Sequence, residues 1–180
     1  EIIARPGDQG LQISTTGAGP AMKVSKLTFT YPGATEPTLQ DLEFELGAGK
    51  TLGIFGPTGS GKTTLLNVLA RVYDPAPNTV FLEEKDITQT PIKDYWRSVA
   101  MVSQSPFLFS RSIRQNIALA ESQSSISAPD LEHAVEGAAL ADEIEGFPSG
   151  LDTIVGERGV TLSGGQRQRV AIARALINRP

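Results

Sequence analysis

Hydrophobic and polar residues alternate along two segments in the first third of the chain. Over residues 22–31 the alternation slips by one position between Val24 and Leu27, whereas residues 42–46 alternate without a break and then meet Gly47. A period of two is typical of a strand with one buried face, and the slip indicates a β-bulge. We therefore expect the two segments to pair in an antiparallel layer.

Other apolar runs predict further elements. Short strands are expected at residues 51–55, 80–82 and 99–102, the last of them buried. Apolar residues spaced three and four apart predict helices, which are expected at residues 65–72, 112–120, 129–137, 138–145 and 165–178. The region 5–20 is rich in Gly, Pro, Ser and Thr, which is typical of a linker.

Between the strand 51–55 and the helix after it lies the pattern G-x-x-x-x-G-K-[ST]. Its residues are Gly56, Pro57, Thr58, Gly59, Ser60, Gly61, Lys62 and Thr63. Glycines allow backbone N–H groups to point inward, and the helix N-terminus adds positive partial charge, so the loop is suited to phosphate. Lys62 would reach the β- and γ-phosphates, and the Thr63 hydroxyl would bind Mg²⁺. The alternative is a glycine-rich turn without a ligand.

Composition narrows the function. The net charge of −4 and the absence of a Lys/Arg cluster argue against nucleic acid as the main partner. Without cysteine there is neither a disulfide framework nor a thiolate metal site. No apolar run is long enough to span a bilayer. Because the chain begins at Glu1 without a leader, we expect it to be a piece of a longer protein.

A second motif opens the last predicted helix. Ser163 and Gln166 have the spacing of a capping box, and Gly164 and Gly165 lie between them. Each glycine costs about 1 kcal/mol relative to alanine in a helix, so a pair of them favours close approach of another group to the backbone. Phosphate is the natural candidate.

Together these motifs resemble the nucleotide-binding domain of ABC transporters, over residues 22–180. Residues 56–63 resemble the Walker A loop and residues 162–166 the signature motif. Gln104 resembles the Q-loop glutamine and Tyr31 the A-loop aromatic, while residues 155–159 resemble the X-loop of exporters. Among relatives, the chain resembles the bacterial multidrug exporters with fused membrane and ATPase domains.

The resemblance implies an α/β fold: a P-loop NTPase (RecA-like) core with an antiparallel β subdomain and a helical signature subdomain, incomplete at its C-terminus. We expect a linker at 1–21, a β layer and P-loop core at 22–104, a mostly helical part at 105–162 and the signature helix at 163–180. The implied cofactors are ATP and Mg²⁺. Lys62 and Gln104 would be catalytic, and Thr63 and Gln104 would hold Mg²⁺. ATP would also contact Tyr31, the Walker A residues and Thr64 and, from a second domain, Ser163, Gly164, Gly165 and Gln166.

The resemblance also implies partners and a place in the cell. Two nucleotide-binding domains would face each other head to tail, each beside a transmembrane domain, at the cytoplasmic face of the cell membrane. ATP binding and hydrolysis would power substrate export. One alternative is a soluble ABC-type clamp acting on nucleic acid or ribosomes. Another is a nucleotide sensor that does not hydrolyse ATP.

The chain departs from the family pattern at its end. The family's Walker B strand, catalytic glutamate and switch histidine belong downstream of Pro180, so we expect negligible hydrolysis by this chain alone. Residues 80–84 imitate the apolar-then-acidic pattern but precede Gln104 and resemble a strand of the antiparallel layer. There Lys85 replaces the glycine that usually completes a two-residue turn.

Single residues have simpler interpretations as well. Without the family, Tyr31 would be read as a core aromatic and Gln104 as a polar loop residue. Residues 107–109 either fasten the helical part or line a groove that receives a helix of the membrane domain. Both interpretations of residues 107–109 stay open at this point.

Overall fold

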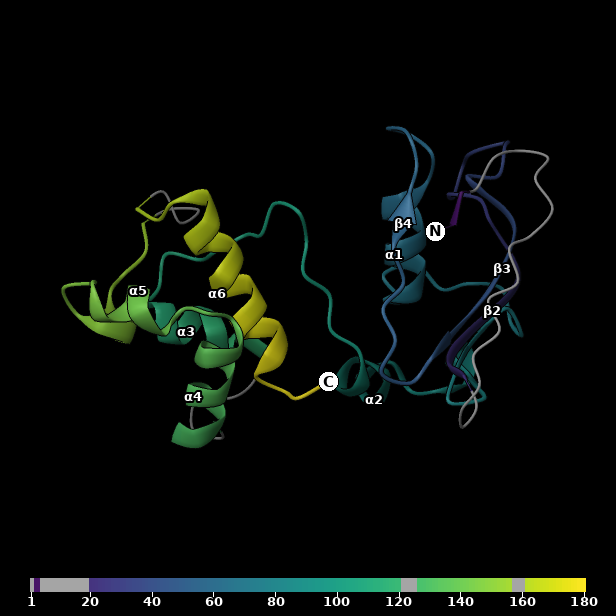
Figure 1. Ribbon diagram of the computed structural model, residues 1–180. Helices are drawn as coiled ribbons and strands as arrows, with labels where there is room; N and C mark the ends of the chain where they lie inside the picture. Colours follow the sequence, from purple (N-terminus) through teal and green to yellow (C-terminus); the bar gives the residue numbers. More distant parts are fainter. Residues whose placement is uncertain (1, 4–19, 121–125, 157–160) are drawn as a thin grey trace. The chain divides into compact units, whose positions relative to one another are not determined.

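The computed structural model describes residues 2–3, 20–120, 126–156 and 161–180 (Figure 1). The chain divides into two compact units, Glu1–Tyr95 and Trp96–Pro180, called here the amino-terminal and the carboxy-terminal unit and described separately. Residues 4–19 of the expected linker lie outside the described residues. The expected domain boundaries after residues 21, 104 and 162 stay predictions.

The amino-terminal unit is built on a four-stranded antiparallel sheet with the order β3-β2-β5-β6. Its strands are β2 (Pro20–Phe29), β3 (Leu39–Gly47), β5 (Val80–Leu82) and β6 (Lys85–Asp86). The predicted antiparallel pairing of β2 with β3 is confirmed, and residues 80–82 form a strand of the same layer. The inward-facing residues of these strands fill the core, among them Val24, Leu27, Phe29, Phe44 and Val80.

The predicted bulge is also confirmed. The register of β2 against β3 shifts between Val24 and Leu27, and Lys26 within it has φ +48°. Val24 and Leu27 are both buried, at 2% and 0% exposure. The extra residue therefore keeps two apolar side chains on one face although they are three positions apart.

The β5–β6 hairpin forms without glycine. Phe81 pairs with Asp86 and Leu82 with Lys85, so Glu83 and Glu84 make the two-residue turn. Their φ angles are +47° and +65°, the left-handed values that such a turn needs. Lys85 lies in β6 rather than in the turn.

Of the strands predicted at 51–55 and 99–102, the first forms only in part and the second does not form. Only β4 (Ile54–Phe55) forms in the first segment, where it pairs in parallel with β1 (Ile2–Ile3), an element that the pattern did not predict. The prediction of a buried strand at 99–102 is wrong: the segment has no strand structure, and Met101 is 40% exposed. A buried strand needs hydrogen-bonded neighbours on both edges, and no described segment pairs with this one.

Helix α1 (Lys62–Leu69) follows the glycine loop. Leu65 and Val68 are buried as predicted, but Leu66 and Val72 are 46% and 57% exposed. The helix ends before Val72 because Arg71 takes a left-handed φ of +52°. The 3₁₀ turn η1 (Ile87–Gln89) and helix α2 (Ile92–Ser98) were not predicted.

Tyr95 connects α2 to the end of α1. It is 1% exposed, and its hydroxyl donates a hydrogen bond to the Leu69 carbonyl. Burial raises the pKa of Tyr95 to about 12, although the nearby Arg71 charge opposes the change. The Arg71 guanidinium lies 5.6 Å from the centre of the Tyr95 ring.

The carboxy-terminal unit is helical. Its elements are α3 (Ile113–Ile117), η2 (Ala118–Ala120), α4 (Ala128–Gly137), α5 (Ala141–Glu145), η3 (Gly150–Asp152) and α6 (Gly164–Leu176). These agree with the predicted helices apart from their ends. The helix expected at 138–145 begins only at Ala141, because Ala139 has φ +51° and separates it from α4.

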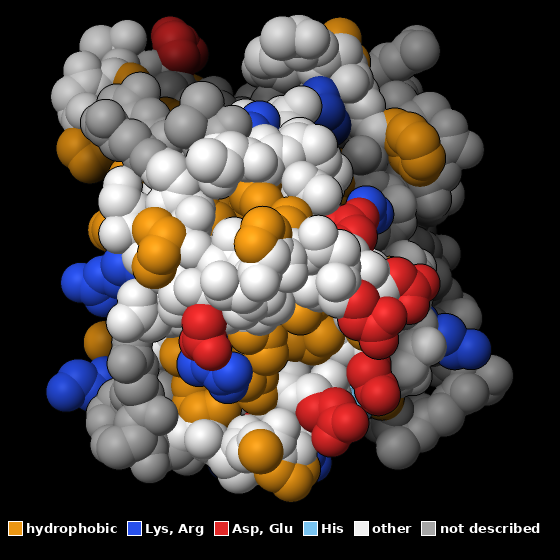
Figure 2. All heavy atoms as spheres, turned by 90° about the vertical axis from the view of Figure 1, so that its left-hand side faces the viewer, with side chains coloured by type: hydrophobic (Ala, Val, Ile, Leu, Met, Phe, Trp, Pro, Cys, Tyr) orange, Lys and Arg blue, Asp and Glu red, His pale blue; other side chains and the backbone are white. Residues whose placement is uncertain are grey.

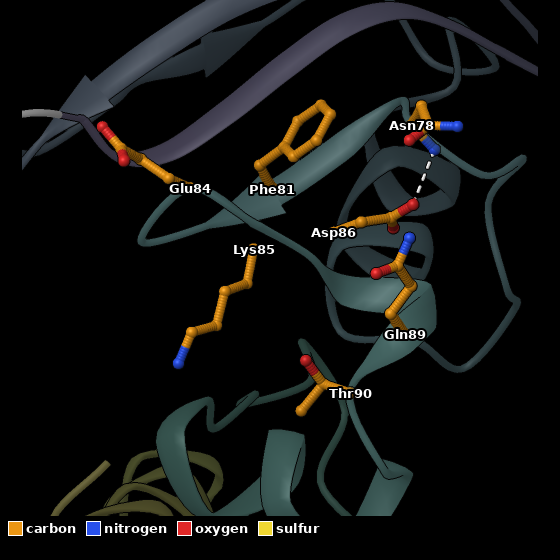
Figure 3. Close-up of a pocket in the computed structure, with 7 residues that line it drawn as sticks. All are labelled: Asn78, Phe81, Glu84, Lys85, Asp86, Gln89 and Thr90. Atoms are coloured by element: carbon orange, nitrogen blue, oxygen red, sulfur yellow. Dashed lines mark hydrogen bonds between the residues drawn. The ribbon is translucent and has the colours of Figure 1, made fainter.

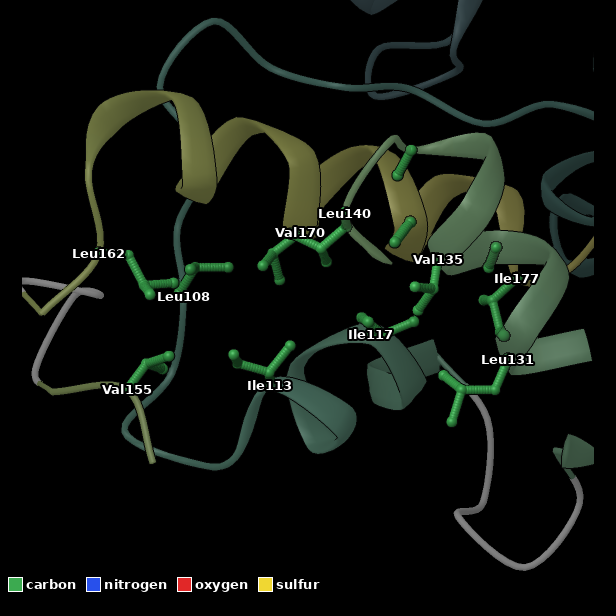
Figure 4. Close-up of a cluster of buried hydrophobic side chains, with 13 residues drawn as sticks. Leu108, Ile113, Ile117, Leu131, Val135, Leu140, Val155, Leu162, Val170 and Ile177 are labelled. Atoms are coloured by element: carbon green, nitrogen blue, oxygen red, sulfur yellow. The ribbon is translucent and has the colours of Figure 1, made fainter. Parts of the chain in front are cut away.

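Helix α6 packs against α3 and α4 around one apolar cluster (Figure 4). The side chains of α3, α4 and α6 point toward one another in this cluster, and Leu108, Val155 and Leu162 close its other end. Val170 and Ala173 of α6 are fully buried. The position of the signature helix is therefore set by hydrophobic packing along its length.

A polar network adds to this packing. Asn116 of α3 is fully buried, accepts a hydrogen bond from the Phe109 N–H at 2.8 Å and donates to the Phe109 carbonyl at 3.0 Å. Arg174 of α6 donates to the Asn116 carbonyl at 2.7 Å and to the Phe107 carbonyl at 3.0 Å. The loop of residues 107–111 is thereby fastened to α3 and α6.

Neither a membrane-spanning helix nor a group of metal-binding side chains was found where the structure describes the chain. No helix in the described ranges is both long and apolar enough to cross a bilayer. Over the same ranges, no three His, Cys, Asp or Glu residues are grouped to hold a metal ion.

Candidate functional site: a glycine loop and two glycine-bearing helix starts

The loop of residues 56–63 connects β4 to α1 and is shaped by its glycines. Gly59 and Gly61 have φ of +86° and +88°, a left-handed conformation that other residues rarely adopt. A Cβ on Gly61 would lie 2.9 Å from Leu39 Cδ2 and 3.1 Å from the Thr38 carbonyl oxygen. The loop therefore needs glycine at this position for two separate reasons.

Lys62 folds back over the same loop. Its ammonium donates to the carbonyls of Gly56 at 2.8 Å and Pro57 at 2.7 Å, and to Ser60 Oγ at 3.4 Å. The ammonium of Lys62 thus lies against the backbone of the loop. A phosphate bound by residues 56–63 would therefore find the Lys62 ammonium already beside the loop.

The start of α1 carries no side-chain cap. Gly61 is its N-cap residue, and the first turn has no acidic side chain. The first N–H groups of a helix have no partner within the helix, and the helix dipole makes them attractive to anions. Thr63 is exposed at this start, whereas Thr64 is buried at 7%. The N–H groups, the lysine and an exposed hydroxyl are therefore together at one place.

Tyr31 lies beside this helix. Its hydroxyl shares a hydrogen bond of 3.0 Å with Thr64 Oγ1, and its half-buried ring packs edge-on against Phe29 and Tyr73. The structure thus brings Tyr31 to the helix that begins with the glycine loop. Tyr73, which directly follows the predicted helix 65–72, was not singled out by the sequence.

The signature residues form the start of α6. Ser163 Oγ accepts from the Gln166 N–H at 3.1 Å, and Gln166 Oε1 accepts from the Ser163 N–H at 2.8 Å. The predicted capping box is therefore confirmed. Ser163, Gly164 and Gly165 are exposed, so the backbone at this start faces solvent.

Arginines hold the first turns of α6. Arg167 donates to the Leu162 carbonyl at 2.6 Å, and Arg169 pairs with Glu143 of α5. An added Cβ on Gly164 or Gly165 would come no closer than 3.9 Å or 3.6 Å to the nearest arginine nitrogen. Unlike Gly61, these two glycines are not required by the described residues around them.

Gln104 is exposed and lies in the loop that follows residues 99–102. The neighbouring Ser103 carbonyl accepts a hydrogen bond from Gln168 Nε2 of α6 at 3.4 Å. Gln104 therefore belongs to the same unit as the signature residues. The glycine loop and Tyr31 belong to the other unit.

Residues 107–109 include one buried and two exposed side chains. Leu108 is fully buried in the apolar cluster, while Phe107 and Phe109 are 53% and 41% exposed, with ring centres 5.0 Å apart. The fastening role is confirmed for Leu108. A groove for a membrane-domain helix stays a prediction. In the expected X-loop only Val155 and Gly156 are described, and residues 157–159 lie outside the described residues.

A cavity of about 440 Å³ lies at the β5–β6 hairpin (Figure 3), and the residues that line it do not include any of residues 56–63. The carboxylate of the buried Asp86 accepts hydrogen bonds from the N–H groups of Asn78 at 2.7 Å and Thr88 at 2.9 Å. Burial raises the pKa of Asp86, but these hydrogen bonds and that of the Thr88 hydroxyl outweigh it and hold the pKa below its usual value. Asp86 therefore links the loop before β5 to the start of η1.

Comparisons with known proteins agree with this geometry. The sequence family described as ABC transporter matches residues 39–180. The chain is 47% identical over 156 residues to the ATP-dependent lipid A-core flippase of Photobacterium profundum, covering 87% of this chain and 26% of that protein. It is 46% identical over 150 residues to the multidrug resistance-like ATP-binding protein MdlA of Escherichia coli, covering 83% and 25%.

A solved structure is similar as well. A bacterial Atm1-family ABC exporter with ATP bound has a TM-score of 0.81 and 35% identity, over 99% of this chain and 30% of that one. The chain thus spans about a quarter of the length of the curated relatives named above. The predicted P-loop NTPase fold, with an antiparallel sheet and a helical part, is confirmed by the family match and by this neighbour. This chain belongs to the ABC transporter family and is an ATP-binding domain of that family.

Proposed function

We propose that the chain binds Mg-ATP at residues 56–63 and couples ATP binding and hydrolysis to export across a membrane, as part of an exporter. The start of α1 carries this proposal: an N-cap glycine without a side chain, beside a lysine that faces the same loop. The triphosphate would take the loop N–H groups and Lys62. Domains of this family bind ATP, generally with Mg²⁺.

The remaining roles follow from the positions of single residues. The hydroxyl of Thr63 and the amide oxygen of Gln104 are exposed and are of the kind that Mg²⁺ accepts. Tyr31 would stack on the nucleobase next to Thr64. Bound Mg²⁺ would offset charge on the phosphates, while Lys62 and Gln104 would orient the γ-phosphate and the attacking water.

The start of α6 would complete a site on a second nucleotide-binding domain. The packing of the described residues does not require the exposed Gly164 and Gly165, which supports a role in contact with another molecule. A glycine-bearing helix start facing the γ-phosphate makes closure of a head-to-tail pair depend on ATP. Each partner would also bind a transmembrane domain, at the cytoplasmic face of the membrane.

The alternative of a clamp on nucleic acid has no support. The relatives named above are a lipid flippase, a multidrug resistance-like protein and an exporter. On the face of the carboxy-terminal unit shown in Figure 2, acidic side chains gather along one side, and the described Lys and Arg side chains form no continuous patch. Binding to a polyanion needs such a patch.

Calorimetric titration of the chain with Mg-ATP tests the proposal. Lys62→Ala removes a cation from the phosphates, so affinity should fall roughly 10- to 100-fold, the range for losing a charged hydrogen bond. Lys50→Ala, at an exposed lysine of the same unit, is the matched control and should bind like the original chain. Equal affinity of the Lys62→Ala and Lys50→Ala variants would contradict the assigned site.

A further inference from the structure

Three aromatic rings meet beside the glycine loop. The Tyr31 ring lies 5.1 Å from Phe29 and 5.2 Å from Tyr73, centre to centre, with interplanar angles of 82° and 89°. Tyr73 also contacts Phe29, at 5.6 Å. Near-perpendicular pairs at these distances are the favoured geometry of aromatic side chains. The Tyr31 ring is therefore held from two sides.

The other end of Tyr31 is held by α1. Its hydroxyl shares the hydrogen bond with Thr64 Oγ1, one residue beyond Thr63 of the glycine loop. Phe29 is buried at 9% exposure, whereas Tyr73 is 36% exposed. Of the two rings that hold Tyr31, Tyr73 is thus the one at the surface, where a planar ligand could also reach.

The position of Tyr73 is fixed by the turn that ends α1. The N–H groups of Val72 and Tyr73 return to the Asn67 carbonyl, at 2.8 Å and 3.5 Å. Arg71 then donates to the carbonyls of Ile87 at 2.6 Å and Thr90 at 2.7 Å, with its own side chain only 8% exposed. These hydrogen bonds hold the backbone that carries Tyr73, whose ring packs against Tyr31.

We propose that Tyr73 is a positioning residue for nucleobase recognition: it fixes the Tyr31 ring in the orientation in which that ring stacks on the base of a bound nucleoside triphosphate. The inference rests on the proposed function, because it needs a triphosphate at residues 56–63. Stacking is stronger when the plane of the ring is set before the ligand arrives, because ordering a free ring upon binding lowers affinity. Tyr73 acts through Tyr31 and does not touch the phosphates.

A purely structural role for Tyr73 makes a different prediction. If Tyr73 only stabilised the amino-terminal unit, its removal would lower the affinity of every ligand of the loop by the same factor. A role in base recognition affects only ligands that carry a base. Inorganic tripolyphosphate has the phosphates of ATP without the base and therefore separates the two roles.

The experiment measures the affinities of Mg-ATP and Mg-tripolyphosphate for the chain and its variants. In Tyr73→Ala the affinity for ATP should fall about threefold to tenfold, the range for losing an edge-on aromatic contact, while tripolyphosphate binds unchanged. Tyr31→Ala should show the same selectivity with a larger loss. Tyr73→Phe keeps the ring and should match the original chain.

A second variant distinguishes the loss of the aromatic ring from a general loss of folded structure. Tyr73→Leu retains an apolar side chain without a ring and should repeat the result of Tyr73→Ala. Equal losses for ATP and tripolyphosphate in Tyr73→Leu, or no loss for either, would overturn the positioning role. If the original chain binds both ligands no better than Lys62→Ala does, the proposed function itself is wrong, and the positioning role is wrong with it.

Discussion

The two units each begin a helix with glycine, yet the two helix starts are built differently. At α1, Gly61 is the N-cap, offers no side chain and could not be replaced without a collision at Thr38 and Leu39. At α6, Ser163 and Gln166 cap the helix, and the glycines after them have room around them. The first start is uncapped and constrained, and the second is capped and unconstrained.

This difference indicates two ways of contacting a phosphate. An uncapped start beside a lysine has N–H groups and a cation available within one chain, so it can hold a triphosphate by itself. A capped start has already satisfied two of its N–H groups, so it adds less affinity alone. Its bare backbone suits close contact with a ligand that another chain already holds. We interpret α1 as the primary site and α6 as a cover supplied in trans.

Among substitutions at the two helix starts, Gly61→Ala is expected to have the largest effect on stability and on ATP affinity. An alanine in the left-handed conformation costs roughly 1–2 kcal/mol, and the forced contact with the Thr38 carbonyl adds about 1–3 kcal/mol. We expect the free energy of unfolding to fall by the sum of these terms, measured by urea denaturation. ATP affinity should fall at least about tenfold, because the loop must shift.

Gly49→Ala is the matched control for this substitution. Gly49 also has a positive φ, of +69°, but an added Cβ would meet nothing within 4 Å. It should lose stability through backbone strain alone and leave ATP affinity unchanged. If the Gly61→Ala variant lost no more stability than the Gly49→Ala variant, the contact with Thr38 would not matter. The claim that this contact requires glycine at position 61 would then be wrong.

The antiparallel sheet could be predicted from the sequence because its information is local. Alternation in β2 and β3 fixes which face is buried, and the slip between Val24 and Leu27 marks the bulge. The segment 99–102 looked equally clear but forms no strand. An apolar run gives the tendency to be buried, whereas a parallel strand also needs neighbours that the run does not specify.

The site was predictable where a motif fixes the spacing of its residues. The glycine loop and the capping box lie where the sequence places them, because neighbours along the chain determine both. Tyr73 and Arg174 could not be predicted, since their contacts with Tyr31 and Asn116 depend on how distant segments pack. The catalytic and Mg²⁺-binding roles of Lys62, Thr63 and Gln104 stay predictions.

A smaller and opposite effect is expected from Gly165→Ala. Alanine suits a helix better than glycine and should raise the free energy of unfolding by about 0.4–1 kcal/mol, since its Cβ would lie an ordinary 3.6 Å from Arg169. ATP affinity of the single chain should not change. Association of two chains in saturating Mg-ATP, followed by analytical ultracentrifugation, should weaken. If Gly165→Ala instead weakened ATP binding and left association unchanged, the roles assigned to the starts of α1 and α6 would be contradicted.

The most direct test of the two-chain site is a mixing experiment with Lys62→Ala and Gly165→Glu. The first variant lacks the primary site, and the second places a carboxylate that the helix dipole favours but a γ-phosphate repels. When the two variants pair head to tail, one of the two shared sites is intact. Its glycine loop comes from the Gly165→Glu chain and its signature residues from the Lys62→Ala chain. We predict that Mg-ATP drives association in the original chain and in the mixture, and in neither variant alone. Association of either variant alone to the extent of the original chain, or none in the mixture while the original chain associates, would contradict a site shared between two chains.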